Sequence, residues 1–125
     1  MQAQVAQLKV SPAEVQKVVA LTGCDLVRSE VSKYSGWDVN VMVAISQAES
    51  GCNPNATGDT SLTYQENGRT YGYSVGVFQV RILLGRESCD THDLKANVAC
   101  AYKVWQGQGY RAWSVYSNNR YLSFM

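Results

Sequence analysis

The four cysteines of this chain, Cys24, Cys52, Cys89 and Cys100, constrain its fold more than any other feature of the sequence. They form no C-x-x-C pair, and with a single histidine in the chain a zinc site would need an unusual set of ligands. An even number of cysteines in 125 residues indicates two disulfide bonds and an oxidising compartment. Of the three pairings that four cysteines allow, we favour Cys24–Cys52 and Cys89–Cys100, because the second pair spans a short loop leading into a helix. The alternative is four buried free thiols.

Length and composition indicate one globular domain. A chain of 125 residues fits a single compact domain, and its 46% of hydrophobic residues argues against disorder. The formal net charge of +1 argues against a protein that grips nucleic acid or anionic lipid through bulk charge. No apolar run approaches the roughly 20 residues that cross a membrane. We therefore expect no nucleic-acid partner and no membrane insertion, and one core suggests a monomer.

Apolar residues recur at helical spacing along most of the chain, which predicts a mainly helical domain over residues 11–125 behind a flexible lead-in at 1–10. The polar stretch at 56–75 predicts a long loop with a small hairpin, and long loops in small domains are usually functional. The first predicted helix runs from Ser11 to Gly23, and the second covers 25–34 with Leu26, Val27 and Val31 inward. The third is capped by Asp38 and ended by Gly51. A fourth covers 94–106, and a short fifth covers 110–117.

Glu49 is the most distinctive candidate for chemistry. It stands at the end of the most apolar predicted helix, four residues after Ile45 and seven after Met42, on the same inward-leaning face. Apolar neighbours and the negative end of the helix dipole would both raise the pKa of a carboxyl group there. A carboxylic acid that stays protonated near neutral pH is what general acid catalysis needs. The alternative is a Glu49 that bends into solvent at a frayed helix end.

Four segments around and after Glu49 resemble the goose-type lysozyme and soluble lytic transglycosylase families. The segments stand in the family order, although the third lacks the family's glycine and places its tyrosine one residue early. They are AESGCNP at 48–54, YSVGVFQV at 73–80, NVACAY at 97–102 and SVYSN at 114–118.

This resemblance implies a lysozyme-like fold, with a central buried helix and a small β element lining a cleft for peptidoglycan glycan strands. It implies Glu49 as the catalytic acid and Tyr116 as the tyrosine whose hydroxyl hydrogen-bonds that carboxyl. It also implies neither a metal nor another cofactor. The substrate-binding residues that it implies are Ser74, Phe78 through its backbone, Gln79 and Tyr102.

The type of reaction depends on which group attacks the sugar once the leaving oxygen has been protonated. An inverting hydrolase needs a second carboxylate, and the candidates are Asp59 and Glu66 in the long loop. Both residues also fit turns, with Glu66 beside a hairpin tip at 65–68. Lytic transglycosylases need no second carboxylate, since the muramoyl 6-hydroxyl attacks and one Glu serves as acid and then base. We therefore expect a lytic transglycosylase first and a hydrolytic lysozyme second.

Two non-enzymatic interpretations remain open. The chain could be a glycan-binding module on a lysozyme-like scaffold, because a fold does not determine chemistry. It could also be a small secreted toxin or inhibitor stabilised by its disulfides. A binding module would have no need of an acid in an apolar setting, so Glu49 distinguishes it from an enzyme. Disulfides and a wall substrate place the protein outside the cytoplasm, secreted, periplasmic or on a phage virion, although no signal peptide is visible at Met1.

Overall fold

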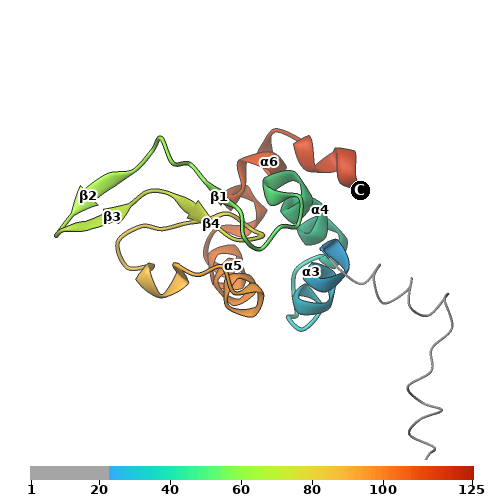
Figure 1. Ribbon diagram of the computed structural model, residues 1–125. Coiled ribbons are helices and arrows are strands. Elements are labelled where there is room, and N and C mark those ends of the chain that lie inside the picture. The colour runs from blue at the N-terminus through green and yellow to red at the C-terminus, as the bar shows by residue number, and fades with distance from the viewer. Residues whose placement is uncertain (1–22) are drawn as a thin grey trace, which may run out of the picture.

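The computed structural model describes residues 23–125, so the predicted lead-in at 1–10 and the helix predicted from Ser11 lie outside the described residues. The described chain has an α+β fold, as the sequence predicts. Helices gather on one side of the molecule, and a small antiparallel β region extends from them (Figure 1). The helices are α3 (Cys24–Val31), α4 (Val39–Ser50), α5 (Leu94–Gln108) and the single-turn α6 (Ser114–Ser117).

Helix α4 is the central helix. Its N-terminus is capped by Asp38, whose side chain accepts a hydrogen bond from the backbone N–H of Val41 at 3.1 Å. Gly51 ends it in the left-handed conformation at φ 65°, where glycine carries no steric penalty. Residues 42–46 are all buried, because α3, α6 and the 3₁₀ segment η3 (Arg120–Phe124) pack against α4. The cap, the stop and the burial confirm the central helix predicted from the sequence.

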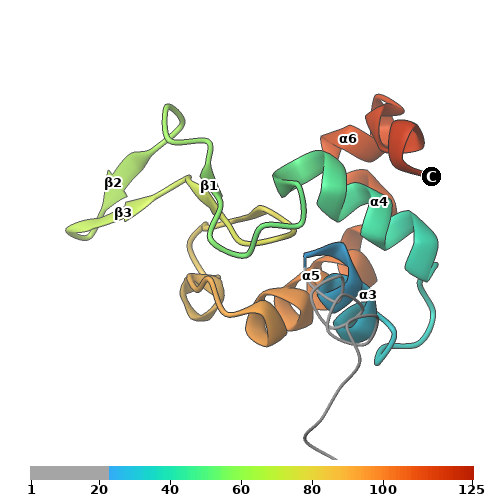
Figure 2. The same ribbon diagram turned by 45° about the vertical axis from the view of Figure 1, so that its right-hand side comes forward.

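Two small sheets make up the β region. Strands β1 (Thr57–Gly58), β4 (Ser74–Val75) and β5 (Val80–Arg81) form an antiparallel sheet in the order β1-β4-β5. Strands β2 (Tyr64–Glu66) and β3 (Arg69–Tyr71) form a hairpin that extends away from the helices (Figure 2). Its turn is Asn67-Gly68, and both residues have positive φ, as a two-residue type I′ turn requires. The hairpin tip predicted at 65–68 is therefore confirmed.

Two disulfides tie these elements together, in the pairing that the sequence favours. Cys24–Cys52 joins the start of α3 to the segment that comes after α4. Cys89–Cys100 joins the 3₁₀ segment η1 (Glu87–Cys89) to α5. The first bond therefore anchors the end of the helix that carries Glu49.

Two details of the predicted helices are wrong. Leu26 is 46% exposed rather than inward, and only Val27 and Val31 of α3 are buried. The helix predicted over 110–117 is divided into the 3₁₀ segment η2 (Gly109–Ala112) and α6, with extended backbone at Trp113. The indole Nε1 of Trp113 donates a hydrogen bond to the carbonyl of Phe78 at 2.9 Å, so a tertiary contact outweighs the local helical preference.

Candidate functional site

Glu49 lies half-buried in the last turn of α4. Its pKa is raised from 4.5 to about 7. Burial, which disfavours the charged carboxylate, is the largest cause, and the negative charge of Asp59 adds to it. The positive charge of Arg120 in η3 acts in the opposite direction. A large fraction of Glu49 therefore carries its proton at neutral pH, and the group can act as a general acid.

Asp59 provides a second carboxylate that acts on Glu49. It comes directly after β1 in a left-handed conformation at φ 55° and is exposed to solvent. The hydroxyl of Ser74, on the neighbouring strand β4, donates a hydrogen bond to Asp59 Oδ2 at 2.5 Å. The structure thus brings three sequence-predicted site residues, Glu49, Asp59 and Ser74, into one place.

Glu66, the other candidate for the second carboxylate, lies elsewhere. It is exposed on β2 and pairs across the hairpin with Arg69. Figures 1 and 2 both show that end of the hairpin far from α4. The charged side chains that influence the pKa of Glu49 are Asp59 and Arg120, so Asp59 is the better placed of the two candidates.

The side chain of Gln79 joins the segment before β1 to the segment after β4, beside Asp59. Its side-chain Nε2 donates to the carbonyls of Ala56 at 3.1 Å and Gly76 at 2.9 Å. Gly58 lies opposite it, and a Cβ there would stand 2.3 Å from Gln79 Oε1, so a larger residue would displace the Gln79 amide. Gln79 also lines a pocket between β5, α5 and η2. The other residues of that pocket, which we call the β5–α5 pocket, are Val80, Arg81, Arg86, Val104, Gln108, Ala112 and Trp113.

Phe78 and Tyr102, both expected to bind substrate, occupy structural positions. The Phe78 ring is fully buried near Trp37 and Trp113. Its backbone N–H donates to Asn97, and its carbonyl accepts from Trp113. The hydroxyl of Tyr102 donates to the carbonyl of Ser35 at 2.6 Å, in the connection between α3 and α4. In the structure these two residues support the packing of the domain. Any effect that they have on a bound glycan is therefore indirect.

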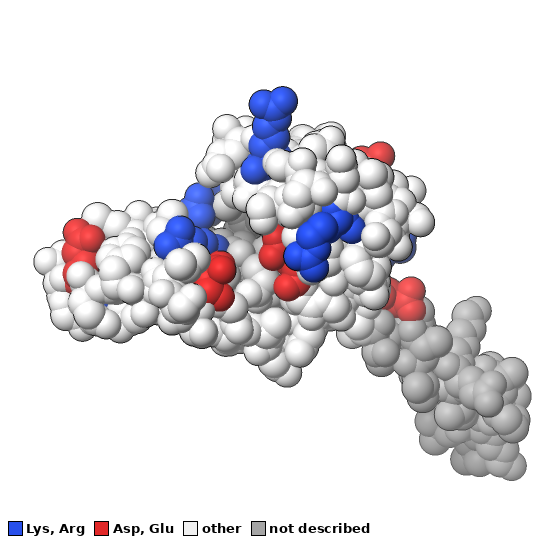
Figure 3. Space-filling model, turned by 90° about the horizontal axis from the view of Figure 1, so that it is seen from above, with Lys and Arg blue, Asp and Glu red and all other residues white. Residues whose placement is uncertain are grey.

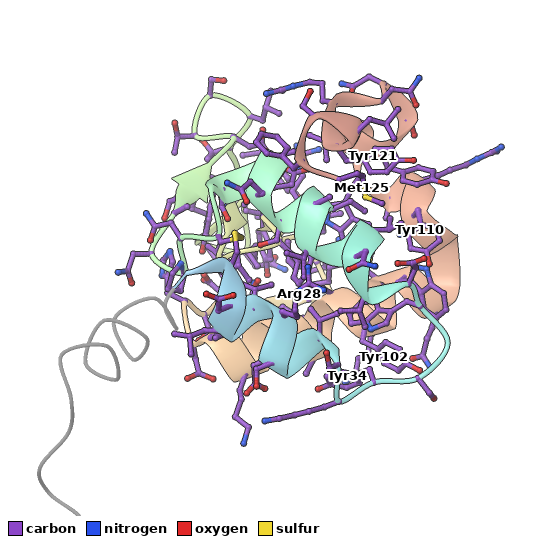
Figure 4. The ribbon with its side chains drawn as sticks, turned by 90° about the vertical axis from the view of Figure 1, so that its right-hand side faces the viewer. Arg28, Tyr34, Tyr102, Tyr110, Tyr121 and Met125 are labelled. Carbon is purple, nitrogen blue, oxygen red and sulfur yellow. A yellow bond between two sulfur atoms is a disulfide. The ribbon has the colours of Figure 1, made fainter. Side chains whose placement is uncertain are left out.

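Tyr116 lies on α6, in the middle of a stack of three tyrosines. Its ring centroid is 5.1 Å from that of Tyr110 and 4.7 Å from that of Tyr121. Figure 4 shows Tyr110 and Tyr121 on the same side of the molecule, beside α4. Among the described residues 23–125 the contacts of its ring are with these two tyrosines, no hydrogen bond joins it to Glu49, and its catalytic role stays a prediction.

Seen from above, the molecule is hollowed between the arm formed by the hairpin and the helical body, and charged side chains of both signs lie beside this hollow (Figure 3).

A family model described as a lysozyme-like domain matches residues 30–115, from α3 into α6, and thus includes Glu49, Asp59 and Ser74. The chain belongs to this family. Comparison with curated proteins gave no match.

Membership confirms the lysozyme-like part of the resemblance and the lysozyme-like α+β fold. Domains of this family are generally glycosidases, and the substrate that membership implies is peptidoglycan. Such enzymes typically act outside the cytoplasm, which agrees with the two disulfides of this lysozyme-like domain.

No helix within residues 23–125 is long and apolar enough to cross a membrane. The same residues contain no cluster of three or more His, Cys, Asp or Glu that could hold a metal ion.

Sequence reasoning gave no role to three polar residues that position the site of this lysozyme-like domain. The hydroxyls of Ser46 and Ser50 on α4 both donate to the carbonyl of Val77, at 3.1 and 2.8 Å. Asn97 on α5 accepts from Phe78 N–H at 3.0 Å and donates to the Val75 carbonyl at 2.9 Å. A serine within an apolar helix was the signal that could have identified Ser46, since buried hydroxyls need partners.

Proposed function

We propose that this lysozyme-like domain cleaves the β-1,4 glycosidic bond between N-acetylmuramic acid and N-acetylglucosamine in peptidoglycan, with Glu49 as the general acid. The observation that carries the proposal is the position of Glu49, half-buried in the last turn of α4, where burial and the negative charge of Asp59 raise its pKa to about 7. Bond cleavage passes through an oxocarbenium-like transition state, and the leaving oxygen must be protonated as the bond breaks. A protonated Glu49 supplies that proton.

The position of Asp59 supports hydrolysis with inversion as the route. In that route a second carboxylate takes a proton from water, which attacks the anomeric carbon on the face opposite the leaving group. Asp59 is exposed, so water reaches it, and Ser74 fixes the direction of its carboxylate. Its negative charge would also stabilise the positive charge that develops on the sugar.

Lytic transglycosylation is the second candidate, and the four ordered motif matches of the sequence favour it. The muramoyl 6-hydroxyl would attack in place of water and give a 1,6-anhydro product. Glu49 would then act first as acid and afterwards as base. Intramolecular attack is favoured because the nucleophile is already positioned. In this route Asp59 contributes only its charge.

Other residues support either route. The β5–α5 pocket, with the Gln79 amide and the Trp113 indole among its lining, offers hydrogen-bonding and apolar surface for a sugar substituent. Tyr116 is proposed to hold the Glu49 carboxyl, since α6 packs against α4. Replacing Tyr116 by Phe tests that role, because the variant keeps the stacked ring and loses only the hydroxyl. An unchanged rate and pH profile would remove Tyr116 from the machinery.

Mass spectrometry of digested peptidoglycan tests the function. We expect cleavage by the parent and none by Glu49→Gln. Reducing-end products together with a loss of at least about a hundredfold in Asp59→Asn would support inverting hydrolysis. Products ending in 1,6-anhydromuramic acid, with substantial activity left in Asp59→Asn, would support transglycosylation.

Glu66→Gln is the matched control, since it removes one exposed carboxylate from the hairpin and should leave the rate unchanged. A loss of activity in Glu66→Gln equal to that in Asp59→Asn would contradict the assignment of Asp59. Binding to several wall types without cleavage would instead identify a glycan-binding module and reject the enzymatic proposal.

A further inference from the structure

The β5–α5 pocket contains two arginines, Arg81 and Arg86, that the proposed reaction does not use. Its volume is about 80 Å³. Pockets that hold drug-sized ligands are typically about 300–1,000 Å³, so this pocket is small. That space suits a substituent of a sugar rather than a whole sugar ring.

Both guanidinium groups retain unused hydrogen-bond donors. Arg81 donates from Nε to the Gly72 carbonyl at 2.8 Å and from Nη2 to the Leu62 carbonyl at 3.4 Å. Arg86 donates from Nη1 to the Arg81 carbonyl at 3.2 Å. Each guanidinium carries five N–H donors, so several on each remain free for a ligand.

Neither arginine has an acidic partner. The ion pairs within residues 23–125 are Lys33–Glu30 and Arg69–Asp90, and neither includes Arg81 or Arg86. The carboxylate of Glu87, next in sequence to Arg86, accepts hydrogen bonds from the Tyr71 hydroxyl and from Gly85 N–H. Both arginines are half-buried, and partial burial of an unpaired cation costs free energy that an anionic ligand would offset.

Strand register connects the pocket to the carboxylates. Gly58, Ser74 and Arg81 are directly opposite one another across β1, β4 and β5. Directly paired residues project from the same face of a sheet, so Arg81 lies beside Ser74, which holds Asp59. The pocket therefore shares the β1-β4-β5 sheet with the strand that orients Asp59.

We propose that the β5–α5 pocket binds a carboxylate of the glycan strand, from the lactyl group of muramic acid or from its peptide stem, through Arg86 and Arg81. The inference rests on the proposed function for the identity of the polymer. Arginine suits this task because its planar fork pairs with both oxygens of a carboxylate. The neutral acetamido group that every sugar of the strand carries would not offset the two charges.

The experiment measures binding rather than cleavage, in the Glu49→Gln protein. The probes are N-acetylmuramic acid, its methyl ester and a muramoyl dipeptide. The readout is the NMR signal of the indole N–H of Trp113, a residue of the pocket lining. We expect the free acid to bind roughly tenfold more tightly than the ester, as the loss of one charged hydrogen bond predicts. Tighter binding of the dipeptide than of the free acid would place the carboxylate in the stem, and the reverse would place it in the lactyl group.

Three variants in the same background complete the test. Arg86→Gln should remove the preference for the acid over the ester, and Arg86→Lys should keep part of it. Arg28→Gln is the control, because it removes the same charge from the α3–α4 face, where Arg28 bonds Asn40 (Figure 4). Equal binding of acid and ester, no binding of either, or a preference that survives Arg86→Gln would overturn the inference. Peptidoglycan cleavage by the parent is scored separately, so a failure of the proposed function is distinguishable from a failure of this pocket.

Discussion

The hydroxyl of Ser74 donates a hydrogen bond to Asp59 Oδ2 at 2.5 Å, and this contact joins β4 to the residue that comes directly after β1. Ser74 is 1% exposed, so bulk water has little access to replace its hydroxyl. Asp59 itself is exposed and has a left-handed backbone. The direction of the second carboxylate is therefore set by the sheet rather than by local packing around Asp59.

Replacing Ser74 by Ala should lower kcat for peptidoglycan about tenfold, because the Asp59 carboxylate loses the contact that orients it. KM should change little, since the Ser74 side chain is buried and its hydroxyl donates to Asp59. Steady-state kinetics on purified glycan strands measure both constants. Ser61→Ala, an exposed serine of the same loop, is the control and should match the parent. A rate for Ser74→Ala equal to the parent rate would show that the orientation of Asp59 does not limit the reaction.

The pH dependence of the rate should reflect Glu49. Since the acid must carry its proton, kcat/KM should fall as the pH rises through about 7, the pKa of Glu49. The charge of Arg120 lowers that pKa, so Arg120→Gln should move the alkaline limb of the profile to higher pH. A limb that stays in place in Arg120→Gln would mean that the limb belongs to another group.

Stability should depend on the same group. The folded pKa of Glu49, about 7, lies above the unfolded value near 4.5, so the folded state binds more protons between these values. Stability from this group is complete below about pH 4.5 and is lost as the pH rises through about 7. Glu49→Gln removes the penalty and should be more stable than the parent by about 2 kcal/mol at pH 8, after allowance for partial solvent exposure. Urea unfolding at pH 4 and pH 8 measures the difference, which should nearly vanish at pH 4.

Local signals in the sequence predicted much of this fold. Asp38 and Gly51 identified the ends of α4, and Asn67-Gly68 identified the hairpin turn, because caps and turns depend on neighbouring residues. The position of Glu49 on an apolar face already implied a raised pKa. These inferences needed no knowledge of which segments meet in space.

Contacts between distant segments were beyond the sequence. Nothing local distinguishes Asp59 from Glu66 as the second carboxylate, because the difference arises from the pairing of β1 with β4. The break at Trp113 likewise depends on a hydrogen bond to Phe78, 35 residues earlier. Tyr102 matched a family motif, yet its hydroxyl donates to the Ser35 carbonyl. Side-chain roles thus depended on the tertiary fold more than on the motif.

Asn97 provides a test of the buried hydrogen bonds behind the site. Its amide is fully buried and bridges Val75 and Phe78, on either side of Gly76. Asn97→Asp replaces the donor with an oxygen that faces the Val75 carbonyl, and should cost about 3 kcal/mol in the free energy of unfolding. Asn53→Asp is the control, because the exposed Asn53 uses only its Oδ1, as an acceptor from Asn55 N–H. Urea denaturation of both variants gives the comparison, and equal small losses would show that water replaces the missing contact at Asn97.

The two disulfides should differ in what their removal costs. Loop-closure entropy predicts a loss of about 3.6 kcal/mol for Cys24–Cys52, with a sequence separation of 28, and about 2.8 kcal/mol for Cys89–Cys100, with a separation of 11. The first bond also anchors the segment after α4, so the Cys24→Ser/Cys52→Ser variant should lose more activity as well as more stability. Urea unfolding and cleavage rates of the two double-serine variants measure both effects at one temperature. The opposite result for activity would be a Cys89→Ser/Cys100→Ser variant that is more stable than the other variant but less active. That result would show that Glu49 is supported from the α5 side, through Asn97 and Val77, rather than by the Cys24–Cys52 bond.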